Sequence, residues 1–199
     1  MTGKKIALYA VGGIVAVILI LAIWMLGPAL LPPKPIDAGI AVGDKVPIEM
    51  PLKDSEGKAT TLGQQMGDAG MVLLFVRSAD WCPFCKAQLA RTEEISGQVS
   101  AKAFSLAGLS YDDPGKLAQF AGENDVSFAL LSDKGSKMID ALGLRDPQYE
   151  EGSFAYGVPR ASILFLGTDG TVLEKYVAAD YRSRPSNEDI LAILSDVAP

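Results

Sequence analysis

The sequence predicts an α/β domain, a mixed β-sheet flanked by helices with an N-terminal hairpin extension, preceded by one transmembrane helix. Three observations lead to this prediction: an apolar run near the N-terminus, strand-length apolar stretches that alternate with helical patterns, and a final pair of strands around a glycine turn. The chain has 199 residues, of which 49% are hydrophobic and 21% charged, which suits one globular domain plus an apolar segment.

The apolar run covers residues 6–27 and contains no charged residue. A helix rises about 1.5 Å per residue, so this run is long enough to cross a lipid bilayer and too long for a cleaved signal peptide. A buried core helix is the alternative, but the run is apolar on all sides. Lys4 and Lys5 precede it, so we expect residues 1–5 in the cytoplasm and the rest of the chain in the periplasm or another extracytoplasmic space.

A proline- and glycine-rich segment over residues 28–43 predicts a stiff linker, and residues 44–199 then form the soluble domain. Its first element is a hairpin within residues 46–62, where two short apolar stretches surround a turn at 54–57. This hairpin is expected at an edge of the sheet.

Three strand–helix units follow the hairpin. Residues 71–77 are continuously apolar, which predicts a central strand covered on both faces. Pro83 suits the first turn of a helix that extends to Val99. The second and third units are a strand at 104–109 with a helix at 113–122, and a strand at 126–131 with a short helix at 136–142.

The C-terminal part predicts an antiparallel hairpin and a last helix. After a loop at 144–157, strands at 162–166 and 172–177 flank the turn sequence Gly167-Thr168-Asp169-Gly170. Ser186 is the expected cap of the final helix, whose first turn carries acidic residues that suit the helix dipole.

Composition excludes several kinds of site. The chain has no histidine, which excludes imidazole bases, Ser-His-Asp triads and His-ligated metals. It has 18 basic and 24 acidic residues, a formal net charge of −6 that argues against a nucleic-acid partner.

Cys82 and Cys85 stand where the strand at 71–77 meets the helix that begins at Pro83. Unpaired N–H groups and the positive potential of a helix N-terminus stabilise a thiolate. We expect Cys82 to expose its sulfur and attack a substrate, and Cys85, one turn further and more covered, to resolve the mixed disulfide. The sequence therefore predicts a redox-active disulfide as the catalytic group, with no metal and no other cofactor.

Three structural interpretations compete with this one. A Cys-x-x-Cys pair can be half of a zinc site, but the chain has no second pair of thiol or imidazole ligands. It can be a structural disulfide, although so short a loop gives little chain-entropy gain. The two cysteines could also be unrelated, which the run Trp81-Cys82-Pro83 at a strand–helix junction disfavours.

The run Trp81-Cys82-Pro83-Phe84-Cys85-Lys86 after LLFVR resembles the active site of the thioredoxin superfamily, in particular redoxins of the alkyl hydroperoxide reductase/thiol-specific antioxidant group. GDKVPIEMPLKDSEGKATTL is similar to that group's N-terminal extension, and YGVPRASILFLGTDGTVLEKY with DYRSRPSNEDIL to its C-terminal half. The resemblance spans residues 42–197 and implies a thioredoxin-like fold. With the anchor, the chain resembles the TlpA-like thiol-disulfide oxidoreductases of bacterial periplasms.

The resemblance also implies supporting residues. Pro159 is the candidate for a cis-proline that faces the cysteine pair, unless it is trans and simply starts a strand. Arg160 lies close to where peroxiredoxins carry an arginine. Arg160 and Arg77 would favour a thiolate at Cys82, unless both are solvated or paired with an acid such as Asp80.

The remaining neighbours of the pair have simpler expectations. Asp80 could relay a proton to Cys85 if it is buried, and is a loop acid if it is exposed. Trp81 is expected to pack beside the sulfurs rather than take part in the chemistry. Phe84 replaces the polar residue of strongly oxidising pairs, which favours a reductant.

The leading functional hypothesis is a membrane-tethered extracytoplasmic thiol-disulfide oxidoreductase that reduces protein disulfides with electrons from a transmembrane or periplasmic donor. The alternative is a peroxiredoxin-like thiol peroxidase. The peroxiredoxin pattern Pro-x-x-x-Thr-x-x-Cys is absent, because counting back from Cys82 gives Ala79 and Phe75, and counting back from Cys85 gives Cys82 and Ser78. A third possibility is a thioredoxin-like structural subunit of a membrane complex.

Overall fold

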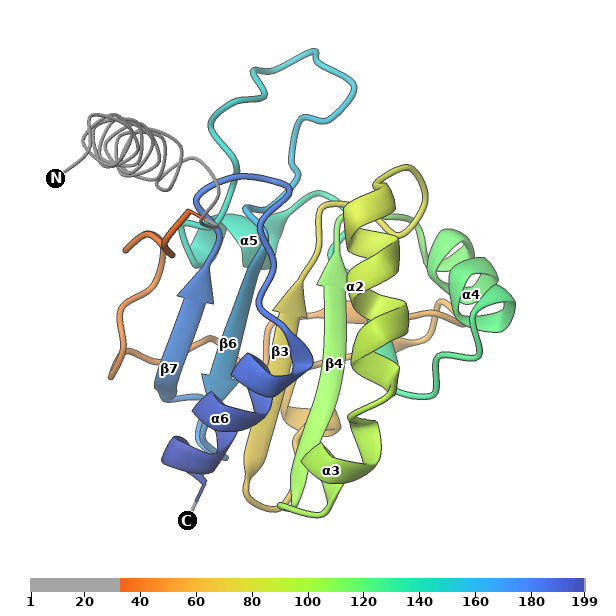
Figure 1. Cartoon of the computed structure of the whole chain (residues 1–199). Helices are drawn as coiled ribbons and strands as arrows, with labels where there is room; N and C mark the ends of the chain where they lie inside the picture. The colour runs from red at the N-terminus through yellow and green to blue at the C-terminus, as the bar shows by residue number, and fades with distance from the viewer. Residues whose placement is uncertain (1–32, 199) are drawn as a thin grey trace, which may run out of the picture. The chain divides into compact units, whose positions relative to one another are not determined.

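The computed structural model describes residues 33–198, which contain a seven-stranded sheet with helices packed on it (Figure 1). The strands are β1 (Leu52–Asp54), β2 (Ala59–Thr60), β3 (Gly70–Phe75), β4 (Phe104–Ser110), β5 (Ala129–Ser132), β6 (Ser162–Leu166) and β7 (Val172–Val177). The helices are the 3-10 turn η1 (Gly63–Gln65), α2 (Pro83–Glu93), α3 (Ser96–Ser100), α4 (Pro114–Glu123), α5 (Lys137–Ala141) and α6 (Asn187–Val197).

The strand order is β2-β1-β5-β4-β3-β6-β7, so β3 lies inside the sheet. β3, β4 and β5 run parallel, whereas β6 is antiparallel to both β3 and β7, and the β1/β2 hairpin is antiparallel to β5. All six residues of β3 are buried. The predicted mixed sheet, the central strand and the edge hairpin are therefore confirmed.

Two hydrophobic clusters lie on opposite faces of the sheet, because alternate residues of β3 belong to each. One cluster packs residues from four helices against the sheet: Leu89 of α2, Val99 of α3, Phe120 of α4 and Leu194 of α6. The other is closed by α5 and the N-terminal segment, which contribute Met138, Val46 and Leu62. Helices thus flank both faces, but one short helix and irregular chain cover the second.

Residues 36–43, assigned to the linker by their composition, pack on the domain. The amide of Ile36 donates to Val177 at 2.9 Å, and the amide of Gly43 donates to Val172 at 2.8 Å. Backbone hydrogen bonds to β7 thus hold this segment on the domain, although its sequence has too little apolar periodicity to predict that it packs there.

The N-terminal segment at 1–5, the transmembrane helix predicted over 6–27 and residues 28–32 of the predicted linker lie outside the described residues. Within residues 33–198, no helix is both long and apolar enough to cross a membrane.

The helix predicted from Pro83 to Val99 is two helices, so that prediction is wrong. α2 ends at Glu93, and α3 begins at Ser96. At the break, the carbonyl of Arg91 accepts from the Glu94 amide at 3.1 Å and from the side chain of Asn187, from α6, at 2.9 Å.

The third strand also begins later than predicted, at Ala129 rather than Val126. The amide of Val126 donates to the carbonyl of Ala121 at 3.1 Å, which makes Val126 part of the C-terminal turn of α4. Asp125, with φ of 51°, turns the chain there.

The C-terminal elements follow the prediction. β6 and β7 have the predicted bounds, and Gly170 takes the left-handed conformation that their turn requires, with φ of 82°. Ser186 caps α6 in a reciprocal arrangement: its hydroxyl accepts from the Asp189 amide at 3.1 Å, and the Asp189 carboxylate accepts from the Ser186 amide at 2.9 Å.

Candidate active site

The cysteine pair lies where the chain leaves the buried strand β3 and enters α2, at the upper end of the sheet in Figure 1. Cys82 is the N-cap of α2, with extended backbone (φ −94°, ψ 103°), and Pro83 opens the helix as predicted. The Cys82 sulfur accepts a hydrogen bond from the Cys85 amide at 3.3 Å. The same amide also donates to the Cys82 carbonyl at 3.1 Å, so the sulfur shares this donor at the helix start with a backbone oxygen.

Cys82 and Cys85 are joined in a disulfide, with their Cα atoms 5.3 Å apart. Cys82 is only 2% exposed and Cys85 is fully buried. The expectation that Cys82 exposes its sulfur is therefore wrong. Both side chains belong to the hydrophobic cluster between the sheet and α2, and Trp81 packs against that cluster.

A guanidinium group is hydrogen-bonded to the sulfur of Cys85, but it belongs to neither of the two predicted arginines. Nη2 of Arg184, from the connection between β7 and α6, donates to Sγ of Cys85 at 3.4 Å. Its Nε is buried and has no hydrogen-bond partner. Burial, together with the like charge of Arg77, lowers the pKa of Arg184 to about 10, so the side chain remains charged at neutral pH.

Arg77 is 3% exposed and lies among aromatic rings. Its guanidinium carbon is 5.4 Å from the ring centre of Trp81, 4.9 Å from that of Tyr149 and 5.0 Å from that of Tyr181. Its Nη2 donates to the Tyr149 hydroxyl, while its Nε is buried without a partner. Ring faces therefore surround this cation, and no carboxylate among residues 33–198 forms an ion pair with it.

Arg160 lines a pocket together with Arg77, so the two predicted arginines do lie near each other. In the described part of the chain, however, the only arginine hydrogen-bonded to a cysteine sulfur is Arg184. Pro159 does not face the pair as a cis-proline, because residues 33–198 contain no cis peptide bond. Pro159 forms a bridge with Arg145 instead, and the Arg160 amide donates to Leu144 at 2.6 Å.

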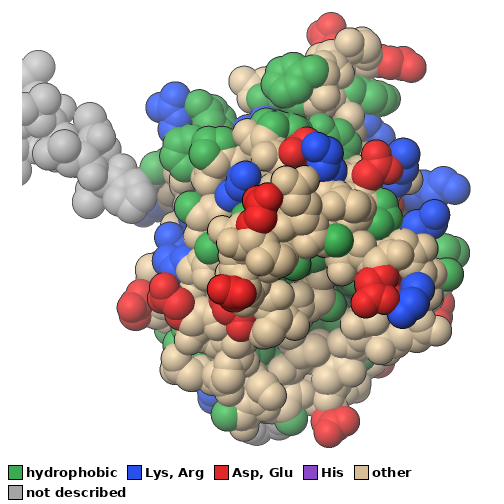
Figure 2. All heavy atoms as spheres, turned by 90° about the vertical axis from the view of Figure 1, so that its right-hand side faces the viewer, with side chains coloured by type: hydrophobic (Ala, Val, Ile, Leu, Met, Phe, Trp, Pro, Cys, Tyr) green, Lys and Arg blue, Asp and Glu red, His purple; other side chains and the backbone are tan. Residues whose placement is uncertain are grey.

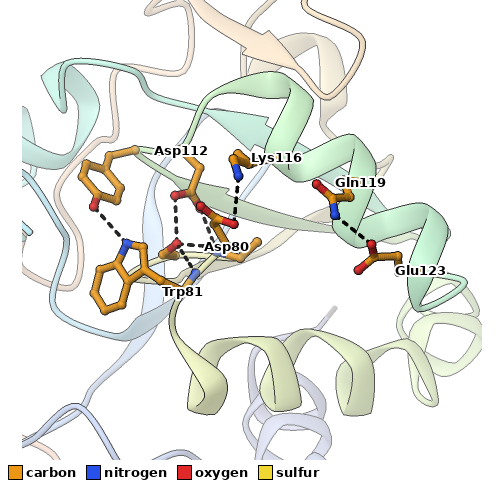
Figure 3. A network of polar contacts seen from close by, with 9 residues as sticks. Asp80, Trp81, Asp112, Lys116, Gln119 and Glu123 are labelled. Atoms are coloured by element: carbon orange, nitrogen blue, oxygen red, sulfur yellow. Dashed lines mark hydrogen bonds and ion pairs between the residues drawn. The ribbon is translucent and has the colours of Figure 1, made fainter.

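Asp80 is the exposed loop acid of the two alternatives. Its Oδ1 is 3.1 Å from Nζ of Lys116, and its side chain is 45% exposed (Figure 3). It therefore does not occupy the buried position that a proton relay to Cys85 requires.

The buried acid near the pair is Asp112, two residues beyond β4, which sequence reasoning missed. Its carboxylate accepts from the Ala79 amide at 2.7 Å and from the hydroxyls of Ser78 and Ser110, both at 2.9 Å (Figure 3). Burial raises the pKa of Asp112, and these hydrogen bonds oppose that rise. The Ser78 hydroxyl also accepts from the amides of Asp80 and Trp81. Asp112 thus holds the loop that leads into Cys82.

Aromatic side chains surround the site. Phe84, between the cysteines, is 40% exposed and packs edge-on against Tyr181 at 5.7 Å. Phe154 is 78% exposed and packs edge-on against Trp81 at 5.3 Å. Hydrophobic side chains are visible on the loop that projects at the top of Figure 2. Within residues 33–198 no cluster of acidic, histidine or cysteine side chains could hold a metal ion.

Residues 42–175, about two thirds of the chain, match the AhpC/TSA family. The chain belongs to the AhpC/TSA family. Among AhpC/TSA relatives, Peroxiredoxin Bcp of Escherichia coli is 24% identical over 159 residues, which cover 80% of this chain and 98% of the relative. Chloroplastic Peroxiredoxin Q of Gentiana triflora is 32% identical over 123 residues, 59% of this chain and 56% of the relative.

The fold agrees with AhpC/TSA membership. The crystal structure of Peroxidoxin BcpB from Mycobacterium tuberculosis superposes with a TM-score of 0.68 at 23% identity, covering 80% of this chain and 99% of that one. The predicted thioredoxin-like fold is thereby confirmed, and the chain is a peroxiredoxin-like redoxin of the thioredoxin superfamily.

Proposed function

We propose that this chain is a thiol peroxidase in which Cys82 and Cys85 cycle between dithiol and disulfide. A cysteine thiolate attacks a hydroperoxide, releases the alcohol or water and becomes a sulfenic acid. The second thiol condenses with it, releases water and forms the disulfide, which an external thiol donor reduces. Membership of the AhpC/TSA family and the peroxiredoxin relatives support this reaction over the reductase favoured by the sequence alone.

The observation that carries the proposal is the contact between Arg184 and the Cys85 sulfur. A hydrogen bond from a charged donor is roughly twice as strong as a neutral one, so a thiolate is better stabilised at Cys85 than at Cys82, which accepts only from a backbone amide. We therefore assign the attack on peroxide to Cys85 and the resolving role to Cys82, the reverse of the order expected from the sequence.

Burial of the pair also favours a small substrate. Both sulfurs are covered in the disulfide form, so the folded domain leaves little opening to them. A hydroperoxide needs a much smaller opening than the disulfide of a folded protein.

Peroxide consumption by the full-length chain and two single-cysteine variants tests the proposal. With dithiothreitol as donor, the wild type should turn over hydrogen peroxide. Cys82→Ser should consume one equivalent and accumulate a sulfenic acid on Cys85 that dimedone traps, whereas Cys85→Ser should stay at background. A reactive Cys85→Ser variant with an inert Cys82→Ser variant would reverse the two roles, and an inert wild type would reject the peroxidase.

A second candidate is thiol-disulfide exchange with protein disulfides. The exposed rings of Phe84 and Phe154 give the site an apolar rim of the kind that contacts proteins. The residues Thr and Pro of the peroxidatic pattern are also absent. Insulin reduction by the reduced chain tests this activity: a rate that falls on Phe154→Ser while peroxide turnover is unchanged would support it, and a rate equal to free dithiothreitol would exclude it.

We also propose, from the sequence pattern alone, that residues 6–27 anchor the chain and that the domain lies outside the cytoplasm, where a transmembrane or periplasmic donor would supply electrons. Protease added to intact spheroplasts should remove the domain. Full protection of the domain until the membrane is lysed would contradict this orientation.

A further inference from the structure

A pocket of about 540 Å³ lies at the same end of the sheet as the disulfide, and the peroxidase chemistry above does not use it. It is lined by the residue segments that follow β3 and β7 and precede β6, all at the end of the sheet where α2 begins (Figure 1). Ala161 and Ala178 are buried in its wall, and the Ala178 amide donates to the Ala161 carbonyl at 2.9 Å. Two small side chains at adjacent strand ends leave this space open.

Two cations line the pocket and have no ion-pair partner in the described part of the chain. They are Arg77, which is 3% exposed and has a buried Nε without a hydrogen-bond partner, and Arg160. Burying a guanidinium without a counter-charge is costly, and ring faces compensate only part of that cost at Arg77. The pocket therefore contains a charge that a bound anion would neutralise.

The two acidic residues that line the pocket already accept hydrogen bonds from backbone amides of their own loops. Oδ1 of Asp146 accepts from the Gln148 amide at 3.1 Å, and Oδ1 of Asp180 accepts from the amides of Arg182 and Ser183 at 2.7 and 2.8 Å. Two carboxylates oppose two guanidiniums, so a dianion would be repelled more than a monoanion. A carboxylate also matches the planar fork of a guanidinium.

Two residues that line the pocket contact the aromatic neighbours of the disulfide. The Arg77 guanidinium lies over Trp81, which precedes Cys82, and it lies over Tyr181, which packs on Phe84 between the cysteines. Arg77 and Tyr181 both line the pocket. The other end of a small molecule held by its carboxylate would thus lie near Trp81 and Phe84, next to the two cysteines.

We propose that the pocket between Arg77 and Arg160 binds the carboxylate of the small molecule that exchanges electrons with the Cys82–Cys85 pair. The inference rests on the proposed function. The molecule is either a hydroperoxide, reduced to its alcohol and water as the dithiol becomes the disulfide, or a thiol, two equivalents of which become their own disulfide as the dithiol is restored.

Calorimetric titration of the oxidised full-length chain tests the pocket without any turnover. Pentanoate should bind once per chain, and the neutral isostere pentanamide should bind at least tenfold more weakly. Arg160→Gln should abolish the difference between the two, as should Ala178→Leu, which fills the space and leaves both arginines in place. Arg182→Gln is the matched control, because Arg182 stacks on Tyr181 at 5.1 Å without lining the pocket.

Steady-state kinetics then separates the two sources of the carboxylate. Hydroperoxyhexanoate is compared with its methyl ester, and 3-mercaptopropionate with 3-mercaptopropanol. The charged member of one pair should have a KM about tenfold lower. Arg160→Gln should remove that advantage, whereas Arg182→Gln should keep it. Equal binding of pentanoate and pentanamide, or equal KM values within both pairs, overturns the pocket proposal. If pentanoate binds but no substrate turns over, the peroxidase function fails and the anion pocket stands.

Discussion

The two sides of the disulfide are built in opposite ways. Toward β4, the carboxylate of Asp112 accepts three hydrogen bonds, two of them from the loop before Cys82. Toward β7, the guanidinium groups of Arg184 and Arg77 each keep a buried nitrogen without a partner. A saturated carboxylate fixes the position of a loop, whereas an unneutralised cation stabilises a charge that appears only during a reaction. The acidic side therefore holds the sulfurs in place, and the basic side is the one suited to chemistry.

The largest effect is expected from breaking the acidic side. Asp112→Ala leaves buried donors of Ser78, Ala79 and Ser110 without their acceptor, which should lower the free energy of unfolding by about 3 kcal/mol. Urea unfolding measures this loss. The control is Asp113→Ala: the neighbouring carboxylate is 59% exposed and pairs with Lys134, so its loss should be about 0.5 kcal/mol. Equal losses in the two variants would contradict a structural role for Asp112.

The pH dependence of stability tests how burial affects the Asp112 carboxyl group. Burial raises the pKa of Asp112 above its ordinary 3.8, so the folded state binds its proton more tightly than the unfolded state. The stability that this proton contributes is fully present below the unfolded pKa and is lost as the pH rises through the folded pKa. Relative to Asp112→Asn, the wild type should therefore lose stability as the pH increases above 3.8. Unfolding curves from pH 3 to 7 test this, and a relative gain would show that the hydrogen bonds outweigh burial.

On the basic side, Arg184→Met is introduced in the Cys82→Ser background, where Cys85 is the remaining thiol. Alkylation of Cys85 at pH 7 should slow about tenfold, because the thiolate loses about 1.4 kcal/mol of stabilisation. Iodoacetamide kinetics measure it. Arg184→Lys keeps the charge and should retain most of the rate. An unchanged rate in Arg184→Met would remove the basis for assigning the attack to Cys85.

The smallest effect is expected at Asp80, whose ion pair with Lys116 is exposed to solvent. Asp80→Asn should change the free energy of unfolding by less than about 0.5 kcal/mol and should leave the alkylation rate unaltered. A clear loss of thiol reactivity would restore the proton relay that the sequence suggested for this residue.

The junction of β3 with α2 could be predicted because its signals are local. A continuously apolar strand, two cysteines one turn apart and Pro83 after Cys82 specify the strand, the helix start and the cysteine pair within one short segment. The same holds for Ser186 and the start of α6, where the cap and its partner are three residues apart.

The residues around the pair could not be predicted, since tertiary contacts select them. Arg184 lies 99 positions from Cys85, and nothing in its sequence neighbourhood points to a sulfur. Asp80 is adjacent to the cysteine motif but points to solvent. Asp112, 33 positions from Ala79, instead binds the loop before Cys82 from the end of β4. The last turn of α2 is likewise contacted by the Asn187 side chain, 96 positions from Arg91.

Burial of both sulfurs in the hydrophobic cluster couples oxidation to folding through a thermodynamic cycle. The difference in unfolding free energy between disulfide and dithiol forms equals the difference in reduction free energy between folded and unfolded chains. Because the closed loop is very short, chain entropy contributes little, and contacts around the sulfurs dominate. Arg184 favours the form that carries a thiolate. The difference in stability between the melting curves of the two redox forms therefore reports how much the fold changes the reduction potential of the cysteine pair.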